Sequence, residues 1–193
     1  MRKAVSLILL MASFIAASSV AYPAELNLGP NNFAVKLDSI HFTDGALKSV
    51  DNGFYTGLEG YGDIGKNFYI GAEVGYAKMD GSEDDLGTRV DEELIFIPIE
   101  LNLKYTIKIV SRLIFDIGVG GSYNYVKETD TVEGVSSSLH EWLWGGQFFA
   151  DINYKVGQFF LGANGKYQLT KNAKDFGNNF NNWRVGGQIG VRF

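Results

Sequence analysis

Eight stretches in which apolar and polar residues alternate constrain the fold of this chain more than any other feature. An alternation with a period of two is the pattern of a β-strand with two different faces. Each stretch has about ten to fourteen residues, longer than the ~5–6 residues of an ordinary strand and close to the ~9–11 residues of a tilted membrane-crossing strand. The stretches cover residues 33–42, 53–62, 68–78, 94–105, 113–126, 142–154, 159–169 and 183–193.

The connections between these stretches alternate in length. The short ones are 63–67, 106–112 and 155–158, and the long ones are 43–52, 79–93, 127–141 and 170–182. Short turns at one end and long loops at the other are typical of outer-membrane barrels, in which the turns face the periplasm. The sequence therefore predicts an all-β fold, an eight-stranded antiparallel transmembrane β-barrel with up-and-down topology.

Alternation alone does not say which face points outward, because a soluble ligand-binding barrel also alternates. The polar face of the stretches, however, combines charges with glycines such as Gly71, Gly75, Gly145 and Gly162. Glycine weakens a solvent-facing strand, whereas a narrow lumen needs small residues beside large polar ones. We therefore expect the apolar face to contact lipid, with aromatic residues near both ends of the strands forming two belts.

The lumen is expected to hold a network of charges. Its predicted members are Glu59, Glu73, Glu100, Lys104, Asp116, Asp151, Lys166, Arg184 and Arg192. Because a buried charge without a partner is costly, we expect pairing, for example between Lys104 and Asp116 on neighbouring strands. One interpretation is a plugged interior that stiffens the barrel, and the other is a narrow or gated ion path.

Pro98 lies inside one of the predicted strands. Proline removes a ladder hydrogen bond, and a closed barrel has no edge strand to accommodate it. We therefore predict a β-bulge at Pro98.

The N-terminus has the composition of a secretory signal. Arg2 and Lys3 precede an apolar run over residues 4–17, and Ser19-Val20-Ala21 supplies small residues for cleavage after Ala21 or at a nearby position. The alternative, a membrane-anchoring helix, is disfavoured because the run is shorter than the ~20 residues of a span. We expect a signal peptide at 1–21 and one barrel domain at 22–193.

Composition excludes several functions. The formal charge of −5 disfavours nucleic-acid binding, which needs a basic face. The absence of cysteine excludes disulfides and thiolate chemistry. Only His41 and His140 could serve as catalytic bases, and the serines at 136–138 near His140 do not by themselves make a catalytic geometry. We expect no enzyme activity, no cofactor and no metal site.

The long loops are the expected place for any recognition, since binding usually sits on loops of a rigid scaffold. The second loop is acidic, with Asp80, Glu83, Asp84, Asp85, Asp91, Glu92 and Glu93 against Arg89. The spacing of these carboxylate residues does not match that of a calcium-binding loop. We therefore expect a solvated acidic loop, with weak divalent-cation binding as the alternative. Phe176 and Phe180 of the fourth loop are expected either to contact a partner or to belong to a mobile tip.

Three segments resemble the small eight-stranded outer-membrane barrels, the OmpA-like and opacity-like porin superfamily. They are the stretch 69–76, the Ile97-Pro98-Ile99 sequence that leads to Lys104-Tyr105, and the terminal Phe193. The resemblance covers essentially the whole of residues 22–193. It implies a location in the cell outer membrane, contact with its lipid, and insertion by the barrel-assembly machinery. The assembly signal would comprise Val185, Ile189, Val191 and Phe193.

The resemblance implies an integral protein of the cell envelope with a structural or surface-interaction, adhesin-like role, whose partner would be reached through the long loops. Two alternatives remain. The first is a narrow or gated channel for ions or small solutes, which requires a continuous water path. The second is a soluble periplasmic ligand-binding barrel, which requires an apolar cavity.

Overall fold

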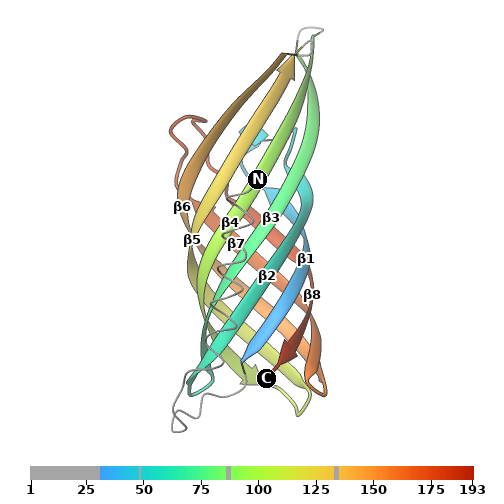
Figure 1. The fold of residues 1–193 in the computed structure, drawn as a ribbon, viewed down its shortest axis with the longest axis vertical. Coiled ribbons are helices and arrows are strands. Elements are labelled where there is room, and N and C mark those ends of the chain that lie inside the picture. The colour runs from blue at the N-terminus through green and yellow to red at the C-terminus, as the bar shows by residue number, and fades with distance from the viewer. Residues whose placement is uncertain (1–30, 48, 86–87, 133–134) are drawn as a thin grey trace.

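The computed structural model is a closed barrel of eight antiparallel strands in sequence order, and it describes residues 31–47, 49–85, 88–132 and 135–193 (Figure 1). The strands are β1 (Asn32–Phe42), β2 (Asn52–Gly65), β3 (Phe68–Asp85), β4 (Thr88–Lys108), β5 (Leu113–Val132), β6 (Val135–Val156), β7 (Phe159–Thr170) and β8 (Asn182–Arg192). Pairing of β1 with β8 closes the sheet. The predicted eight-stranded up-and-down barrel is confirmed, and the predicted signal peptide lies outside the described residues.

Helix is limited in the described part of the chain to the 3-10 turn Gly45–Leu47. No helix there is long and apolar enough to cross a membrane.

The two faces of each strand carry different chemistry, as the alternation predicts. In β8, Arg184 is fully buried whereas its neighbour Val185 is 54% exposed. The same parity holds in β5, where Asp116 is buried and Ile117 is half exposed. Apolar side chains therefore cover the outside of the barrel and charged ones its inside, which is the arrangement of a barrel surrounded by lipid.

Aromatic side chains gather on the outer face at two heights. Near the turns, the rings of Phe68 and Tyr105 lie 4.9 Å apart on neighbouring strands. Near the loops, the exposed aromatic residues are Tyr76, Tyr123, Trp142, Trp144 and Trp183. Because amphipathic rings favour the headgroup regions of a bilayer, the two belts mark its two surfaces.

Four strands are longer than the alternation predicts. We predicted loops at 79–93 and 127–141, but β3 with β4 and β5 with β6 continue through these segments as paired hairpins. Strands β3 to β6 consequently extend beyond the rest of the barrel, away from the C-terminus (Figure 1). The prediction of loops was wrong because a ladder above the membrane has water on both sides and needs no alternation of apolar and polar residues.

No bulge occurs at Pro98, contrary to our prediction. The register of β4 with β5 runs unbroken through the pair Pro98↔Asn124. On the other side, the ladder of β3 with β4 is interrupted between Val74↔Ile99 and Ala77↔Phe96 and resumes in the same register. Because Pro98 has no N–H, the strand loses pairing on one side at this point, but no extra residue is inserted and so no bulge forms.

Several inward-facing glycines make room for aromatic rings on the next strand. Gly118 faces Phe149, Gly71 faces Tyr61 and Gly190 faces Phe160 across their ladders. A Cβ on Gly118 would lie 2.3 Å from the ring of Phe149 and 2.7 Å from the carbonyl oxygen of Leu103. The glycines of the polar face thus allow aromatic side chains to lie flat in a narrow lumen.

Substituting Gly118 by alanine is expected to destabilise the barrel by about 1–3 kcal/mol, because the added methyl group overpacks the lumen. The matched control is Gly121→Ala in the same strand, where the nearest atom to the new Cβ is 4.0 Å away. Urea unfolding of both variants in lipid vesicles, followed by tryptophan fluorescence, measures the difference. Equal stability of the two variants would contradict this packing.

Candidate functional site

A cluster of four charged side chains crosses the middle of the lumen. Glu73 on β3 and Glu100 on β4 face Lys166 on β7 and Arg184 on β8. The guanidinium of Arg184 lies 2.5 Å from a Glu100 carboxylate oxygen, and the ammonium of Lys166 lies 2.6 Å from Glu73. Lys166 also donates a hydrogen bond to Glu100, and all four side chains are buried. These contacts connect opposite walls of the barrel.

Two further charged residues join the lumen that we did not predict there. Lys36 on β1 lies 2.8 Å from Glu59 and 3.3 Å from Glu73. Asp38, two residues along the same strand, accepts a hydrogen bond of 3.0 Å from the amide of Asn164. Both lie on the same face of β1 as the buried Ala34 and Ile40, so the alternation of this strand predicts that they point into the lumen.

The turn end of the lumen holds a second group. The Lys104 ammonium lies 3.7 Å from Asp116 and 3.8 Å from the ring centroid of Tyr61. Asp116 also accepts hydrogen bonds from Thr106 and Asn153 at 2.5 and 3.1 Å. The cavity beside these residues has a volume of about 10 Å³, which leaves room for one water at most.

The remaining predicted lumen charges are placed as follows. Asp151 is 1% exposed, pairs in register with Asp116, and has no hydrogen-bond partner among the described residues. Arg192 is only half buried at the turn end, beside Lys104. The structure thus buries eight of the nine predicted charges and leaves Arg192 at the rim.

A layer of neutral polar groups lies above the central charges. The amide of Gln168 donates to the Ser122 hydroxyl at 2.7 Å and to the Asn124 carbonyl oxygen at 2.9 Å. Its own carbonyl oxygen accepts from Arg184 at 3.3 Å. This layer connects the charge network to the next, apolar layer.

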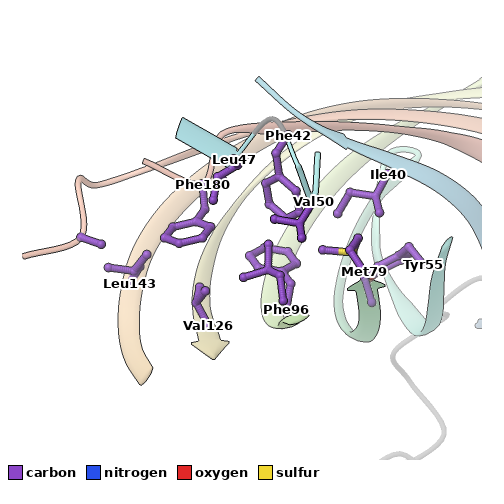
Figure 2. Close-up of a cluster of buried hydrophobic side chains, with 13 residues drawn as sticks. Ile40, Phe42, Leu47, Val50, Tyr55, Met79, Phe96, Val126, Leu143 and Phe180 are labelled. Carbon is purple, nitrogen blue, oxygen red and sulfur yellow. The ribbon is translucent and has the colours of Figure 1, made fainter. Parts of the chain in front are cut away.

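An apolar cluster fills the lumen at the loop end, and it was not predicted (Figure 2). Its buried members are Ile40, Phe42, Leu47, Val50, Tyr55, Ala77, Met79, Leu94, Phe96, Val126, Leu143, Ala173 and Phe180. The ring of Phe42 meets the rings of Phe96 and Phe180 edge to face, with centroids 5.4 and 6.0 Å away. We call this cluster the apolar plug.

The connections 43–51 and 171–181 close over the barrel and complete the apolar plug. Leu47 and Val50 come from the first, and Phe180 comes from the second. Backbone and side-chain hydrogen bonds join the two connections, including Asn179 to Asp44 at 2.7 Å and the Thr43 amide to the Asn181 carbonyl at 2.8 Å. Phe180 is a fully buried member of the plug, so its ring is not available to a partner, whereas Phe176 packs against the plug and stays half-buried.

The acidic segment is built into the extended hairpins. Asp80 and Glu93 lie opposite each other on β3 and β4, and both pair with Lys78 at 3.2 and 2.8 Å. The side chains of residues 83–89 lie outside the described ones. Among the side chains that the structure describes, no three carboxylate or imidazole groups converge in a way that could hold a metal ion.

Two carboxyl groups on the inner side of β5 lie close together above the upper aromatic belt. Burial raises the pKa of Glu128, and the charges of Asp130 and Glu92 raise it further. Burial and the charge of Glu92 likewise raise the pKa of Asp130. The carboxylate forms are therefore less favourable in the folded hairpins than in the unfolded chain.

A Glu128→Gln variant is expected to be more stable than the wild type at pH 8, by less than about 1 kcal/mol because solvent screens a half-buried carboxylate. Since the folded pKa is raised, the wild-type protein gains stability as the pH falls from neutral through that pKa, and the variant gains less. Urea midpoints of both proteins at pH 5 and pH 8 measure the effect. A wild-type advantage at pH 8 would contradict it.

The two histidines and the serine run do not form a catalytic pair in the described residues. The Nδ1 atom of His41 lies 2.9 Å from the side-chain oxygen of Asn52. The ring of His140 packs 6.1 Å from that of Tyr125, while the Ser136 hydroxyl lies 2.9 Å from the Thr131 hydroxyl.

Comparison with known proteins shows which solved structures share this architecture. No protein-family model matches the chain, and no curated protein matches its sequence. Among solved structures, the outer-membrane protein OprG from Pseudomonas aeruginosa superposes with a TM-score of 0.59 at 13% identity, covering 86% of this chain and 96% of OprG. The chain has the fold of the small eight-stranded outer-membrane β-barrels.

Two other barrels with this fold give similar values. Neisserial surface protein A has a TM-score of 0.54 at 15% identity, covering 85% of this chain and 96% of that one. Ail, the attachment invasion locus protein of Yersinia pestis, has a TM-score of 0.54 at 14% identity, covering 86% and 99%. The predicted resemblance to outer-membrane barrels is confirmed at the level of the fold, and the apolar exterior with its two belts agrees with the predicted outer-membrane location.

Proposed function

We propose that this protein is an integral outer-membrane barrel with a sealed lumen, and that it acts as a structural or surface-interaction protein. The observation that carries the proposal is the apolar plug, which spans the lumen above the central charge network (Figure 2). An ion crossing the barrel would have to leave water twice, first at the plug and then between paired charges. The small width of eight strands supports the same conclusion.

The extended hairpins of β3 to β6 are the surface we assign to interaction. They project beyond the rest of the barrel (Figure 1). They also carry exposed charged side chains such as Lys78 and Asp80. Ail, an attachment invasion locus protein, shares this fold, which supports an adhesin-like role. We also propose that the assembly machinery reads Val185, Ile189 and Val191, on the outer side of β8, together with the exposed Phe193 that directly follows the strand.

Planar-bilayer conductance of the refolded protein tests the sealed lumen. We expect no steady conductance from barrels that insert and resist denaturation by detergent at room temperature. The matched variants Glu73→Gln and Lys104→Gln, which change lumen charge at two heights, should be equally silent. Steady currents whose selectivity changes in these variants would overturn the proposal and assign a channel.

A binding assay tests the interaction surface separately. Cells that display the wild-type barrel are compared with cells that display equal amounts of a variant lacking residues 81–92 and 130–137. Adhesion of the wild type to mammalian cells or matrix proteins, lost in the variant, is the expected result. If both adhere equally, or neither adheres, the interaction role is wrong and the structural role remains.

A further inference from the structure

Above the apolar plug, strands β3 to β6 continue as an open sheet rather than as part of the closed barrel. The pairing of β2 with β3 ends at Phe54↔Lys78, and that of β6 with β7 begins at Gly145↔Thr170. Among the described residues, the 135–144 segment of β6 therefore has a strand on one side only. The face of this sheet that continues the lumen wall is consequently open to the side.

That face is partly covered and partly exposed. The connection 43–51 reaches its β4 side, where the Ser49 hydroxyl donates a hydrogen bond to Glu92. On its β5 and β6 side, Val132 is 38% exposed, Leu139 51% and Val135 75%. An exposed apolar surface therefore remains above the plug, turned toward the space over the lumen and away from the bilayer.

The exposed apolar side chains lie among carboxylates. Glu128 on β5 lies opposite Leu139 on β6. Asp130, two residues further along β5, lies opposite Glu92 on β4, and Val132 follows at the outer end of the strand. We call the surface made by Glu92, Glu128, Asp130, Val132, Val135 and Leu139 the acidic-apolar face.

The carboxylates of the acidic-apolar face repel one another. Like charges directly opposite each other on neighbouring strands, as at Asp130 and Glu92, are destabilising. Burial raises the pKa of Glu128, and the charges of Asp130 and Glu92 raise it further. The described residues place no lysine or arginine beside Glu128 or Asp130 to offset this repulsion. A cation supplied from outside would relieve it.

We propose that the acidic-apolar face binds a segment of a partner protein in which lysine or arginine side chains lie between apolar ones. The apolar side chains of the segment pack on Val132, Val135 and Leu139, and its cations pair with Glu128 and Asp130. Charge complementarity supplies the specificity, because the same face repels an acidic segment. This inference rests on the interaction role proposed above, to which it adds the chemistry of the partner and the face that it meets.

Peptide binding to the barrel in nanodiscs of neutral phospholipid tests the proposal, with empty discs as the blank. The probe is a short synthetic peptide in which lysine and leucine alternate. One control peptide replaces leucine by serine, and the other replaces lysine by glutamate. We expect the lysine–leucine peptide to bind at least about tenfold more tightly than either control. Equal binding of the lysine–serine peptide would indicate a general charge effect and overturn the proposal.

Variants locate the binding face. Glu128→Gln combined with Asp130→Asn keeps the side-chain shapes and should weaken the affinity for the lysine–leucine peptide about fivefold, through two lost ion pairs. The matched control is Asp80→Asn combined with Glu93→Gln, which makes the same change of charge on the outer face of β3 and β4 and should have little effect. Equal affinity of the wild type and both variants would overturn the proposal.

The cell-adhesion assay described above separates this inference from the interaction role on which it rests. If displayed wild-type barrels adhere while the purified barrel binds no peptide, the acidic-apolar face is not the docking surface and the interaction role stands. If the barrels neither adhere nor bind the peptide, both are overturned.

Discussion

The variant Arg184→Met is expected to lose about 3–5 kcal/mol of folding stability, because it leaves buried carboxylates without their partner. Arg184 is fully buried, and its guanidinium lies 2.5 Å from Glu100 and 3.7 Å from Glu73. Methionine retains most of the apolar volume, so the loss reports on charge rather than on a cavity. Urea unfolding in lipid vesicles measures the change in midpoint.

Two controls separate charge pairing from general disruption. Arg192→Met changes the same residue type at the half-buried rim and should have a small effect. The double variant Arg184→Met/Glu100→Gln removes a charge of each sign and should recover part of the lost stability. If Arg184→Met is as stable as Arg192→Met, the central network does not stabilise the barrel.

The variant Phe96→Ala is expected to lose about 3–5 kcal/mol of folding stability, because it opens a cavity in the apolar plug. Phe96 is fully buried on β4 and packs edge to face on Phe42. Because the connections 43–51 and 171–181 depend on the plug, their cleavage by an external protease should also accelerate. Unfolding and limited proteolysis of the same sample measure both effects.

The matched control is Leu101→Ala on the same strand. Leu101 is 62% exposed on the outer face, so its truncation changes contact with lipid and leaves the plug intact. We expect little change in protease sensitivity for this variant. Equal sensitivity of the Phe96 and Leu101 variants would mean that the plug does not hold the two connections.

The alternation of residues was enough to predict the strands and their faces. In β8, the parity of Arg184 and Val185 follows directly from the period of two, because successive side chains of a strand point to opposite faces. The same rule placed Asp116 and Lys104 inside, where their charged groups lie 3.7 Å apart. Lys36 and Asp38, which we did not predict in the lumen, obey the same rule on β1.

The apolar plug could not be predicted in the same way. Leu94 and Phe96 point into the lumen like Glu100, as the alternation of β4 predicts. The sequence does not show which side chains they pack against, because those partners come partly from the loops. The ring of Phe180 packs against that of Phe42, which is far away in the sequence. Phe180 lies in the connection 171–181, which has no alternation from which this contact could be predicted. The alternation does not predict the extended hairpins either, because strand pairing above the membrane does not need an apolar face.

The native tryptophans test, without any substitution, whether the apolar exterior of the barrel contacts lipid. Trp142, Trp144 and Trp183 all lie exposed in the upper aromatic belt. In vesicles of lipids brominated at different depths, we predict strong quenching of their fluorescence by bromine near the headgroups and weaker quenching by bromine deep in the chains. Fluorescence unaffected by bromine at every depth would contradict a membrane-spanning barrel.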